Sequence, residues 1–328
     1  MSPSVAIDPL ERLKKIPKHN QKKVIVIAGP TATGKTDLSI ELAGKIKGEV
    51  ISADSMQVYK GLDVGTAKAT LDQMARVPHH LIDIREINEP YNAAAYARDA
   101  YEAISHIMAE NKVPIVVGGN GFYLQSLLYG PPEGPPSDPE IRKKLEEDLE
   151  KFGVEMLFAK LKAFDPSYAQ TITLQDKHKI VRALEIITVT GKKVSDFPKP
   201  TEKKPVDAFE FICFFIYYPK PILYERIEKR CDIMLQEGLI DETIRMKEKG
   251  LEENSSAASA IGYRQVLDYL KTNQTPKDYS DFVAEFKKAS RNYAKRQFTW
   301  FRKQPLFDWI DLTQITHSQL IDKIISQL

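Results

Sequence analysis

Gly29-Pro-Thr-Ala-Thr-Gly-Lys-Thr36 decides the fold, because this stretch matches the phosphate-loop (P-loop) pattern G-x4-G-K-T in full. The β-branched run 23–28 before it predicts a buried strand, and the apolar spacing over 37–46 predicts a helix. In that setting the backbone N–H groups of the loop and the helix N-terminus bind a phosphate chain. Lys35 should neutralise the terminal phosphates, and the Thr36 hydroxyl should bind Mg²⁺. The predicted diphosphate- or nucleotide-binding residues are Gly29, Pro30, Thr31, Ala32, Thr33, Gly34, Lys35 and Thr36.

Further strands are expected on both sides of a polar middle region. Segments 49–53, 113–117 and 209–218 predict strands, and a helix of about twenty residues should begin near Asn92. Such alternation, with glycine-rich turns at strand ends, predicts an α/β fold. We expect a P-loop nucleoside-triphosphate-hydrolase-like, doubly wound parallel sheet. Helices are also expected at about 221–237, 239–250, 258–270 and 279–303.

The amino-acid composition changes at Pro131, where a proline-rich segment begins. Residues 140–190 are helical in pattern and dense in Lys and Glu, with only short apolar faces. We therefore predict a core formed by 21–130 and 206–328, interrupted by a helical insertion domain at 131–205. The length of 328 residues fits two domains.

Composition excludes several classes of protein. Lys and Arg number 47 against 45 Asp and Glu, so a nucleic-acid partner would need a local basic patch. Cys213 and Cys231 lie outside any CxxC motif, which excludes a disulfide scaffold and suits a reducing cytosol. The longest apolar run, 211–218, is far shorter than the roughly 20 residues that span a bilayer. We expect a cytoplasmic protein with no membrane partner.

Asp54 ends the second predicted strand, at the sheet edge where α/β proteins bind ligands. It could act as a general base or metal ligand, or simply cap a helix N-terminus. The strand 115–117 ends in two glycines, where a hydrolase commonly places its Walker B carboxylate. The P-loop alone therefore leaves the reaction open.

Several blocks, in order from about 23 to 303, resemble the tRNA dimethylallyltransferase (tRNA isopentenyltransferase) family. They are GPTATGKT at 29–36, DSMQVY at 54–59, GTAK at 65–68, PHHLIDI at 78–84, GGNGFYL at 118–124, KIVRALEI at 179–186, AIGYRQ at 260–265 and AKRQFTWFRK at 294–303. The resemblance implies transfer of a dimethylallyl group from dimethylallyl diphosphate to N6 of the adenine beside the tRNA anticodon, at position 37. The P-loop would then bind a diphosphate leaving group with Mg²⁺, which fits the missing Walker B carboxylate.

The resemblance also implies roles for single residues. Asp54 would accept the proton of the attacking amine, Lys35 would stabilise the leaving group, and Thr31 would lie close to the diphosphate. An arginine reaching the channel is either Arg226 or Arg230. The expected tRNA contacts by resemblance are Asp54, Ser55, Met56, Gln57, Asn120, Arg142, His178, Lys179 and Arg182.

Two of these positions depart from the family pattern. His178-Lys179 stands where Gln-Arg is usual, so the planar fork of arginine is missing. Asn120 replaces a Thr or Ser in the glycine turn, and it should keep the turn because Asn tolerates left-handed backbone and still hydrogen-bonds.

A local basic patch lies at 281–303, where seven cations face two anions, a local charge of +5. We expect Lys287, Lys288 and Arg291 to contact tRNA phosphates. The interleaved aromatic residues Tyr293, Phe298, Trp300 and Phe301 are expected in the core.

Three other functions remain open at this point. A relative that prenylates free AMP, ADP or ATP would share the P-loop, as would a small-molecule kinase or an RNA-binding NTPase. The insertion and the basic helix favour RNA, and we find no water-positioning residue for an NTPase. The expected partners are the tRNA anticodon stem-loop and dimethylallyl diphosphate, bound by a monomer.

Overall fold

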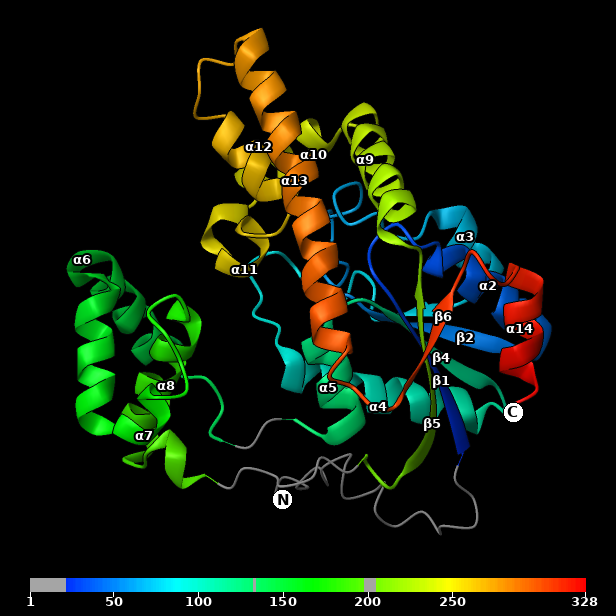
Figure 1. The fold of residues 1–328 in the computed structure, drawn as a ribbon, viewed down its shortest axis with the longest axis horizontal. Coiled ribbons are helices and arrows are strands. Elements are labelled where there is room, and N and C mark those ends of the chain that lie inside the picture. Colours follow the sequence, from blue (N-terminus) through cyan, green and yellow to red (C-terminus); the bar gives the residue numbers. More distant parts are fainter. Residues whose placement is uncertain (1–21, 132–133, 198–204) are drawn as a thin grey trace, which may run out of the picture. The chain divides into compact units, whose positions relative to one another are not determined.

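A computed structural model describes residues 22–131, 134–197 and 205–328 (Figure 1). The chain divides into one compact unit formed by Met1–Pro131 and Pro205–Leu328 and a second formed by Pro132–Lys204. Residue 21 and positions 132–133 and 198–204, which the domain prediction includes, lie outside the described residues. No helix in the described part of the chain is long and apolar enough to cross a membrane.

A parallel sheet of six strands forms the first unit, in the order β3-β2-β4-β1-β5-β6. The strands are β1 Lys22–Ala28, β2 Gly48–Ala53, β3 His79–His80, β4 Val113–Gly118, β5 Phe209–Tyr217 and β6 Phe307–Asp311. The predicted doubly wound α/β class is confirmed. The sequence did not suggest β3 or β6, which lie at the two edges of the sheet.

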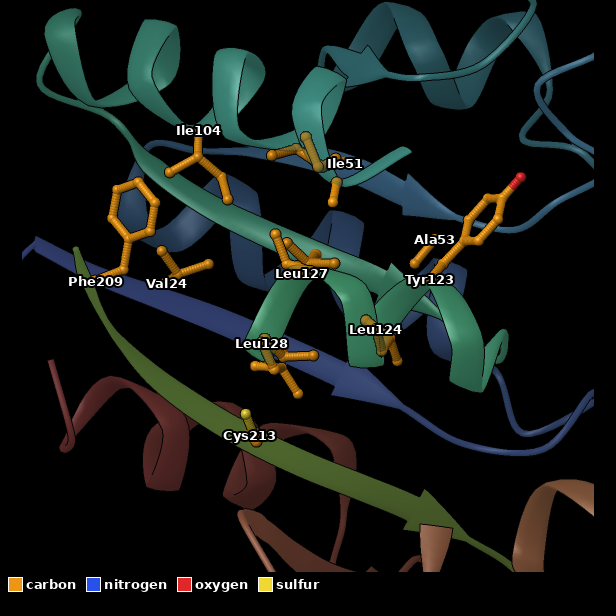
Figure 2. Packing of buried hydrophobic residues seen from close by; sticks show 14 of the residues in the cluster. Val24, Ile51, Ala53, Ile104, Tyr123, Leu124, Leu127, Leu128, Phe209 and Cys213 are labelled. Carbon is orange, nitrogen blue, oxygen red and sulfur yellow. The ribbon is translucent and has the colours of Figure 1, made fainter. Parts of the chain in front are cut away.

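Helices cover both faces of the sheet, because alternate strand residues point to opposite sides. Val24 and Val26 of β1 pack with α4 Ala93–Ala109 and α5 Gly121–Tyr129. Figure 2 shows α5 lying across the strands with its leucines Leu124, Leu127 and Leu128 among the buried residues of this face. Ile25 and Ile27 point the other way, toward α2 and α14. These two helices span Lys35–Ile46 and His317–Ile325.

The remaining helices of this unit stand beyond the C-terminal ends of the strands (Figure 1). They are α3 Leu71–Arg76, α9 Lys220–Gln236, α10 Leu239–Glu248, α11 Ser255–Ala258, α12 Tyr263–Tyr269 and α13 Pro276–Phe301, with the 3-10 turn η3 Leu251–Glu253. Thr275 begins α13 with a capping box, since its side chain accepts a hydrogen bond from the Asp278 N–H.

The core role expected for the α13 aromatics is confirmed for Phe298, Trp300 and Phe301. Phe301 is fully buried, with its ring 4.7 Å from the ring of Phe215. Tyr293 differs, because it lines the large cavity described below.

The second unit is helical. It contains α6 Pro139–Phe164, α7 Pro166–Ala169, α8 Lys177–Thr190 and the 3-10 turn η2 Val194–Asp196. The long α6 is kinked at Gly153, whose φ of 81° is the left-handed region that glycine favours. Leu157, Leu161, Ile180 and Leu184 form its core. The apolar faces are therefore enough to pack the helices of this unit against one another.

Candidate active site

The P-loop connects β1 to α2 and positions Lys35 at the first turn of the helix. The Nζ of Lys35 donates hydrogen bonds to the carbonyl oxygens of Gly29, at 3.0 Å, and Pro30, at 2.7 Å. Burial and the positive charge of Arg230 lower the pKa of Lys35 to about 7, while Asp54 acts in the opposite direction. A bound anion would relieve this unfavourable environment, because it supplies negative charge at the ammonium.

An open cavity of about 1350 Å³ extends from the P-loop over the ends of the strands. This volume exceeds the usual size of a small-molecule pocket. The predicted site residues that line it are Thr31, Ala32, Thr33, Gly34, Lys35, Thr36, Asp54, Ser55, Met56, Gln57, Arg226 and Arg230. Gly29 and Pro30 lie at the base of the loop, and Asn120, Lys287, Lys288 and Arg291 do not line it.

Asp54 caps a turn rather than a helix, since no helix of the described chain begins directly after β2, and its role as a general base stays a prediction. Its Oδ1 accepts hydrogen bonds from the N–H groups of Met56, at 2.8 Å, and Gln57, at 3.3 Å. Only Oδ1 takes part in these bonds, and Asp54 lines the cavity, so a carboxylate oxygen is left without a partner in these bonds. The carboxylate is therefore oriented by its own backbone, as a fixed general base requires.

Both candidate arginines line the cavity, and which of them reaches the channel stays a prediction. The Nε of Arg226 donates to the Ala32 carbonyl at 2.8 Å, and its guanidinium lies 4.7 Å from the centre of the Tyr218 ring. Arg230 donates to the Thr66 carbonyl at 3.3 Å. Burial lowers the pKa of Arg230, and Asp54 opposes that shift. Arg230 is thus the arginine whose charge acts on Lys35 and Asp54.

The comparison with known proteins agrees with this geometry. A family model described as IPP transferase matches residues 57–304. The chain belongs to the IPP transferase family. It is 52% identical over 319 residues to the tRNA dimethylallyltransferase of Protochlamydia amoebophila, covering 96% of this chain and 92% of that one.

Two solved structures of IPP transferase relatives are also similar. One is a tRNA Δ2-isopentenylpyrophosphate transferase from Staphylococcus epidermidis, with 37% identity and a TM-score of 0.66, covering 94% of this chain and 99% of that one. The other is a eukaryotic dimethylallyltransferase acting on tRNA, with 30% identity and a TM-score of 0.75, covering 93% and 80%. As a member of this family the chain is a transferase, and its sheet is the family fold.

Gln57 is expected to contact the tRNA. In this member of the IPP transferase family its side-chain amide is hydrogen-bonded to other residues of the protein. Its Oε1 accepts a hydrogen bond from the Ser52 hydroxyl at 2.9 Å, and its Nε2 donates to the Thr66 carbonyl at 3.3 Å. Each half of the amide can still make one further hydrogen bond, so these contacts hold the side chain without excluding contact with a base. The expectation for Gln57 stays a prediction.

Asn120 caps α5, since its Oδ1 accepts hydrogen bonds from the N–H groups of Phe122 and Tyr123. Its φ of −83° is not left-handed, so the tolerance argued from the sequence is not used. The turn needs Gly119 instead, because a Cβ there would lie 2.2 Å from the Nε2 of Gln297.

Sequence reasoning missed two buried polar residues of this family member. Gln297 on α13 accepts a hydrogen bond from the Thr31 N–H at 3.1 Å and donates to the Gly119 carbonyl at 3.0 Å. Glu242 on α10 accepts bonds from the backbone N–H groups of 63, 64 and 65, and from the Tyr263 hydroxyl. Gln297 lies inside the quoted block AKRQFTWFRK, but no role was inferred for it, and Glu242 lies in none of the quoted blocks. The signal that could have indicated both residues is a polar side chain on the apolar face of an amphipathic helix.

The basic patch on α13 is compensated in the folded chain by carboxylates, two of them on α9. Lys287 contacts Asp232 at 2.7 Å, and Arg291 contacts Glu228 at 2.6 Å. Lys288 contacts Glu285 of its own helix at 2.9 Å. The charge of +5 counted along one segment therefore overstates the local field, because the count ignored the neighbouring helix. Phosphate contact by these three cations stays a prediction.

The insertion residues expected to bind tRNA lie in the second unit. Glu185 accepts hydrogen bonds from the Ser137 hydroxyl and the Asp138 N–H, and it pairs with Arg182 at 2.9 Å. Arg142 bonds to Glu146 at 3.0 Å. Lys179 pairs with Asp176 at 2.7 Å, whereas His178 is exposed. Since Arg182 also donates to the Pro135 carbonyl, part of this set fixes the start of the insertion.

The described residues contain no group of three or more His, Cys, Asp or Glu side chains that could bind a metal ion. Mg²⁺ does not need such a cage, since it usually retains waters and takes phosphate oxygens as ligands. The Thr36 hydroxyl lines the cavity beside the phosphate loop, so it fits a metal ion that arrives with a diphosphate.

Proposed function

We propose that the chain transfers a dimethylallyl group from dimethylallyl diphosphate to N6 of the adenine at position 37, next to the anticodon, in tRNA. The products are N6-(dimethylallyl)adenosine in the tRNA and free diphosphate. The observation that carries the proposal is one cavity that holds both a phosphate loop and a backbone-oriented carboxylate, Asp54. Family membership supports the same reaction.

In the proposed reaction the P-loop side of the cavity binds the leaving group, and the Asp54 side binds the attacking amine. The diphosphate lies against the P-loop amides, where Lys35 and Arg230 stabilise the negative charge that grows as the allylic C–O bond breaks. The N6 nitrogen forms a bond to the same carbon, and its proton passes to Asp54. General-base assistance of this kind contributes roughly 10²–10⁴-fold.

Mg²⁺ is proposed as the metal, held by Thr36 together with the diphosphate. When bound, it neutralises charge on the leaving group. The protein's own part is to bind and orient the diphosphate through the loop N–H groups and Lys35.

The adenine must leave the anticodon loop to reach Asp54, because the P-loop and Asp54 lie inside a cavity. Extruding a loop base costs less than flipping a base out of a duplex. Ser55 and Met56 line the same cavity directly after the carboxylate, which supports the proposal that they contact the base. The partners are thus the tRNA anticodon stem-loop and dimethylallyl diphosphate. We place the activity in the cytoplasm because its substrate is tRNA, and we expect the chain to act as a monomer.

The test is a direct assay. The protein is incubated with Mg²⁺, dimethylallyl diphosphate and unmodified tRNA, and the nucleosides released by digestion are weighed by mass spectrometry. An adenosine heavier by one five-carbon unit is expected, and its absence would overturn the proposal. The same assay with AMP tests prenylation of free nucleotides, and an assay with ATP tests for a phosphorylated product. EDTA should abolish turnover, and added Mg²⁺ should restore it.

A further inference from the structure

A second cavity of about 260 Å³ lies outside the reaction site, between the end of β5, the start of α9 and the C-terminal part of α13. These segments run side by side in Figure 1, and the ring of Tyr217 on β5 lies 5.9 Å from that of Phe298 on α13. The lining residues used below are Tyr217, Tyr218, Tyr224, Lys220, Lys295 and Arg302. We call this cavity the tyrosine pocket.

The charge around the tyrosine pocket is positive and uncompensated. Lys220, Lys295 and Arg302 are exposed, and none of them forms an ion pair with the described residues. No carboxylate from the described part of the chain lines the pocket. This differs from Lys287 and Arg291 higher on α13, which contact Asp232 and Glu228. A polyanion would therefore find unpaired cations here rather than at the patch that the sequence suggested.

The walls of the pocket suit a flat ring. Tyr218 already has a partner on its ring, because the guanidinium of Arg226 lies 4.7 Å from the ring centre. Tyr217 packs edge-on against Phe298 and Trp309. No ring of the described residues stacks on Tyr224, which is only partly buried. Tyr224 packs against the buried cluster beneath α9 but has no such ring stacked on it, so it is the ring of this pocket on which a base can stack.

The pocket is also close to the reaction site. Arg226, which covers Tyr218, donates a hydrogen bond to the Ala32 carbonyl of the P-loop at 2.8 Å. Tyr218 lines the tyrosine pocket and Arg226 lines the large cavity, so the two cavities are neighbours at the contact between these side chains. An RNA whose adenine enters the large cavity has other nucleotides within reach of this wall.

We propose that the tyrosine pocket binds one nucleotide of the tRNA other than the reacting adenine. Its base stacks on Tyr224, and its phosphates contact Lys220, Lys295 and Arg302. This inference rests on the proposed function, because it takes tRNA as the substrate. The combination of unpaired cations and a free aromatic ring is the usual composition of a single-stranded nucleic-acid site.

The experiment measures the dissociation constant of unmodified tRNA at several salt concentrations, without dimethylallyl diphosphate. Tyr224→Ala should weaken binding about tenfold, the scale of one lost stacking contact, whereas Tyr224→Phe should bind like the wild type. Lys295→Ala with Arg302→Ala should reduce the slope of log K against log salt by about two. The matched control is Lys249→Ala with Lys271→Ala, which removes two exposed lysines of the same unit that have no ion pair among the described residues. Thermal unfolding checks that every variant folds.

The outcomes separate this proposal from the function on which it rests. Pocket variants that bind tRNA like the control, in a protein whose wild type binds and prenylates tRNA, overturn the pocket alone. A wild type that binds tRNA but does not prenylate it overturns the reaction, and the binding series can still be read. AMP is the remaining probe. If Tyr224→Ala loses AMP binding but keeps tRNA affinity, the pocket is a free-nucleotide site and the proposal is wrong.

Discussion

The side chain of Gln297 joins α13 to the P-loop, because its Oε1 accepts a hydrogen bond at 3.1 Å from the backbone N–H of Thr31. The two residues are 266 positions apart in the sequence. The other half of the amide donates to the Gly119 carbonyl, so one side chain connects the loops that follow β1 and β4. The phosphate-binding geometry therefore depends on a helix near the end of the chain.

Replacing Gln297 by Ala should loosen this connection. The substitution leaves the Thr31 N–H and the Gly119 carbonyl without their partner at a position where Gln297 is only 5% exposed. An unsatisfied buried polar group costs about 1–3 kcal/mol. We expect a lower midpoint in urea unfolding and a higher KM for dimethylallyl diphosphate. Gln304→Ala, which removes a partly buried glutamine just beyond α13, is the control. An unchanged KM for Gln297→Ala would contradict the role of this bond.

Asp54→Asn removes the proposed general base but keeps the oxygen that accepts the hydrogen bonds of the turn. Asn retains an Oδ1 that can accept the bonds from Met56 and Gln57, but it cannot take a proton from N6. Turnover should fall by about 10²–10⁴-fold, with the affinities for tRNA and diphosphate largely retained. Asp54→Ala should lose turnover as well and also disturb the turn. Single-turnover rates and separate binding measurements check this, and normal turnover by Asp54→Asn would refute the assignment of the base.

The features that could be predicted from the sequence are those formed by residues that are neighbours in the chain. The P-loop with its strand and helix needs only 23–46, and Asp54 directly follows the strand that contains Val50 and Ile51. Edge strands differ: β3 has two residues, and β6 pairs only with β5, so neither leaves a strong pattern. Contacts between distant segments could not be predicted for the same reason. The bond from Gln297 to Thr31 and the pairing of Lys287 with Asp232 depend on packing that no local pattern encodes.

The lowered pKa of Lys35, about 7, makes ligand binding dependent on pH. In the free protein the ammonium loses its proton above that pH, whereas a bound diphosphate favours the charged form. Binding at pH 8 should therefore take up close to one proton. Affinity should weaken as the pH rises above 7, by up to tenfold per unit. Calorimetry in two buffers with different ionisation enthalpies measures the proton uptake, with Lys35→Arg as the control that does not titrate. No uptake at pH 8 would contradict a depressed pKa.

The lowered pKa of Lys35 also makes the free energy of unfolding depend on pH. The sign is opposite to that of a lysine whose pKa is raised by a carboxylate partner. Between about pH 7 and the ordinary lysine pKa of 10.5, the unfolded chain binds more protons at this position than the folded chain. The contribution of Lys35 to stability should therefore increase as the pH rises through that interval. Unfolding midpoints of the wild type and Lys35→Met, compared at pH 7 and pH 9, isolate this contribution. A difference between the two proteins that does not change with pH would contradict it.

Glu242 holds the loop at 63–65 in place, and that loop leads directly to Thr66. The Thr66 carbonyl accepts hydrogen bonds from Gln57 and Arg230, so the carboxylate supports the cavity wall from outside. Glu242→Gln places an amide N–H₂ group against backbone donors, and we expect a loss of about 2–4 kcal/mol in the free energy of unfolding. Tyr263→Phe removes only one of the four bonds to Glu242 and should cost about 1 kcal/mol. Urea unfolding measures both, and equal losses would contradict the central role of the carboxylate.

The ion pair with Asp232 limits the ability of Lys287 to bind a phosphate of tRNA. The lysine contacts this carboxylate at 2.7 Å, so a phosphate must compete with it. If Lys287 binds tRNA, Asp232→Asn should strengthen binding by several-fold at low salt, and the gain should shrink at high salt because screening weakens the released charge. Lys287→Ala with Lys288→Ala should then reduce the slope of log K against log salt by less than two, since both cations are already paired. An exposed acid with no ion pair among the described residues, changed in Glu248→Gln, controls for net charge. Equal effects of Asp232→Asn and Glu248→Gln would exclude Lys287 from the tRNA contact surface.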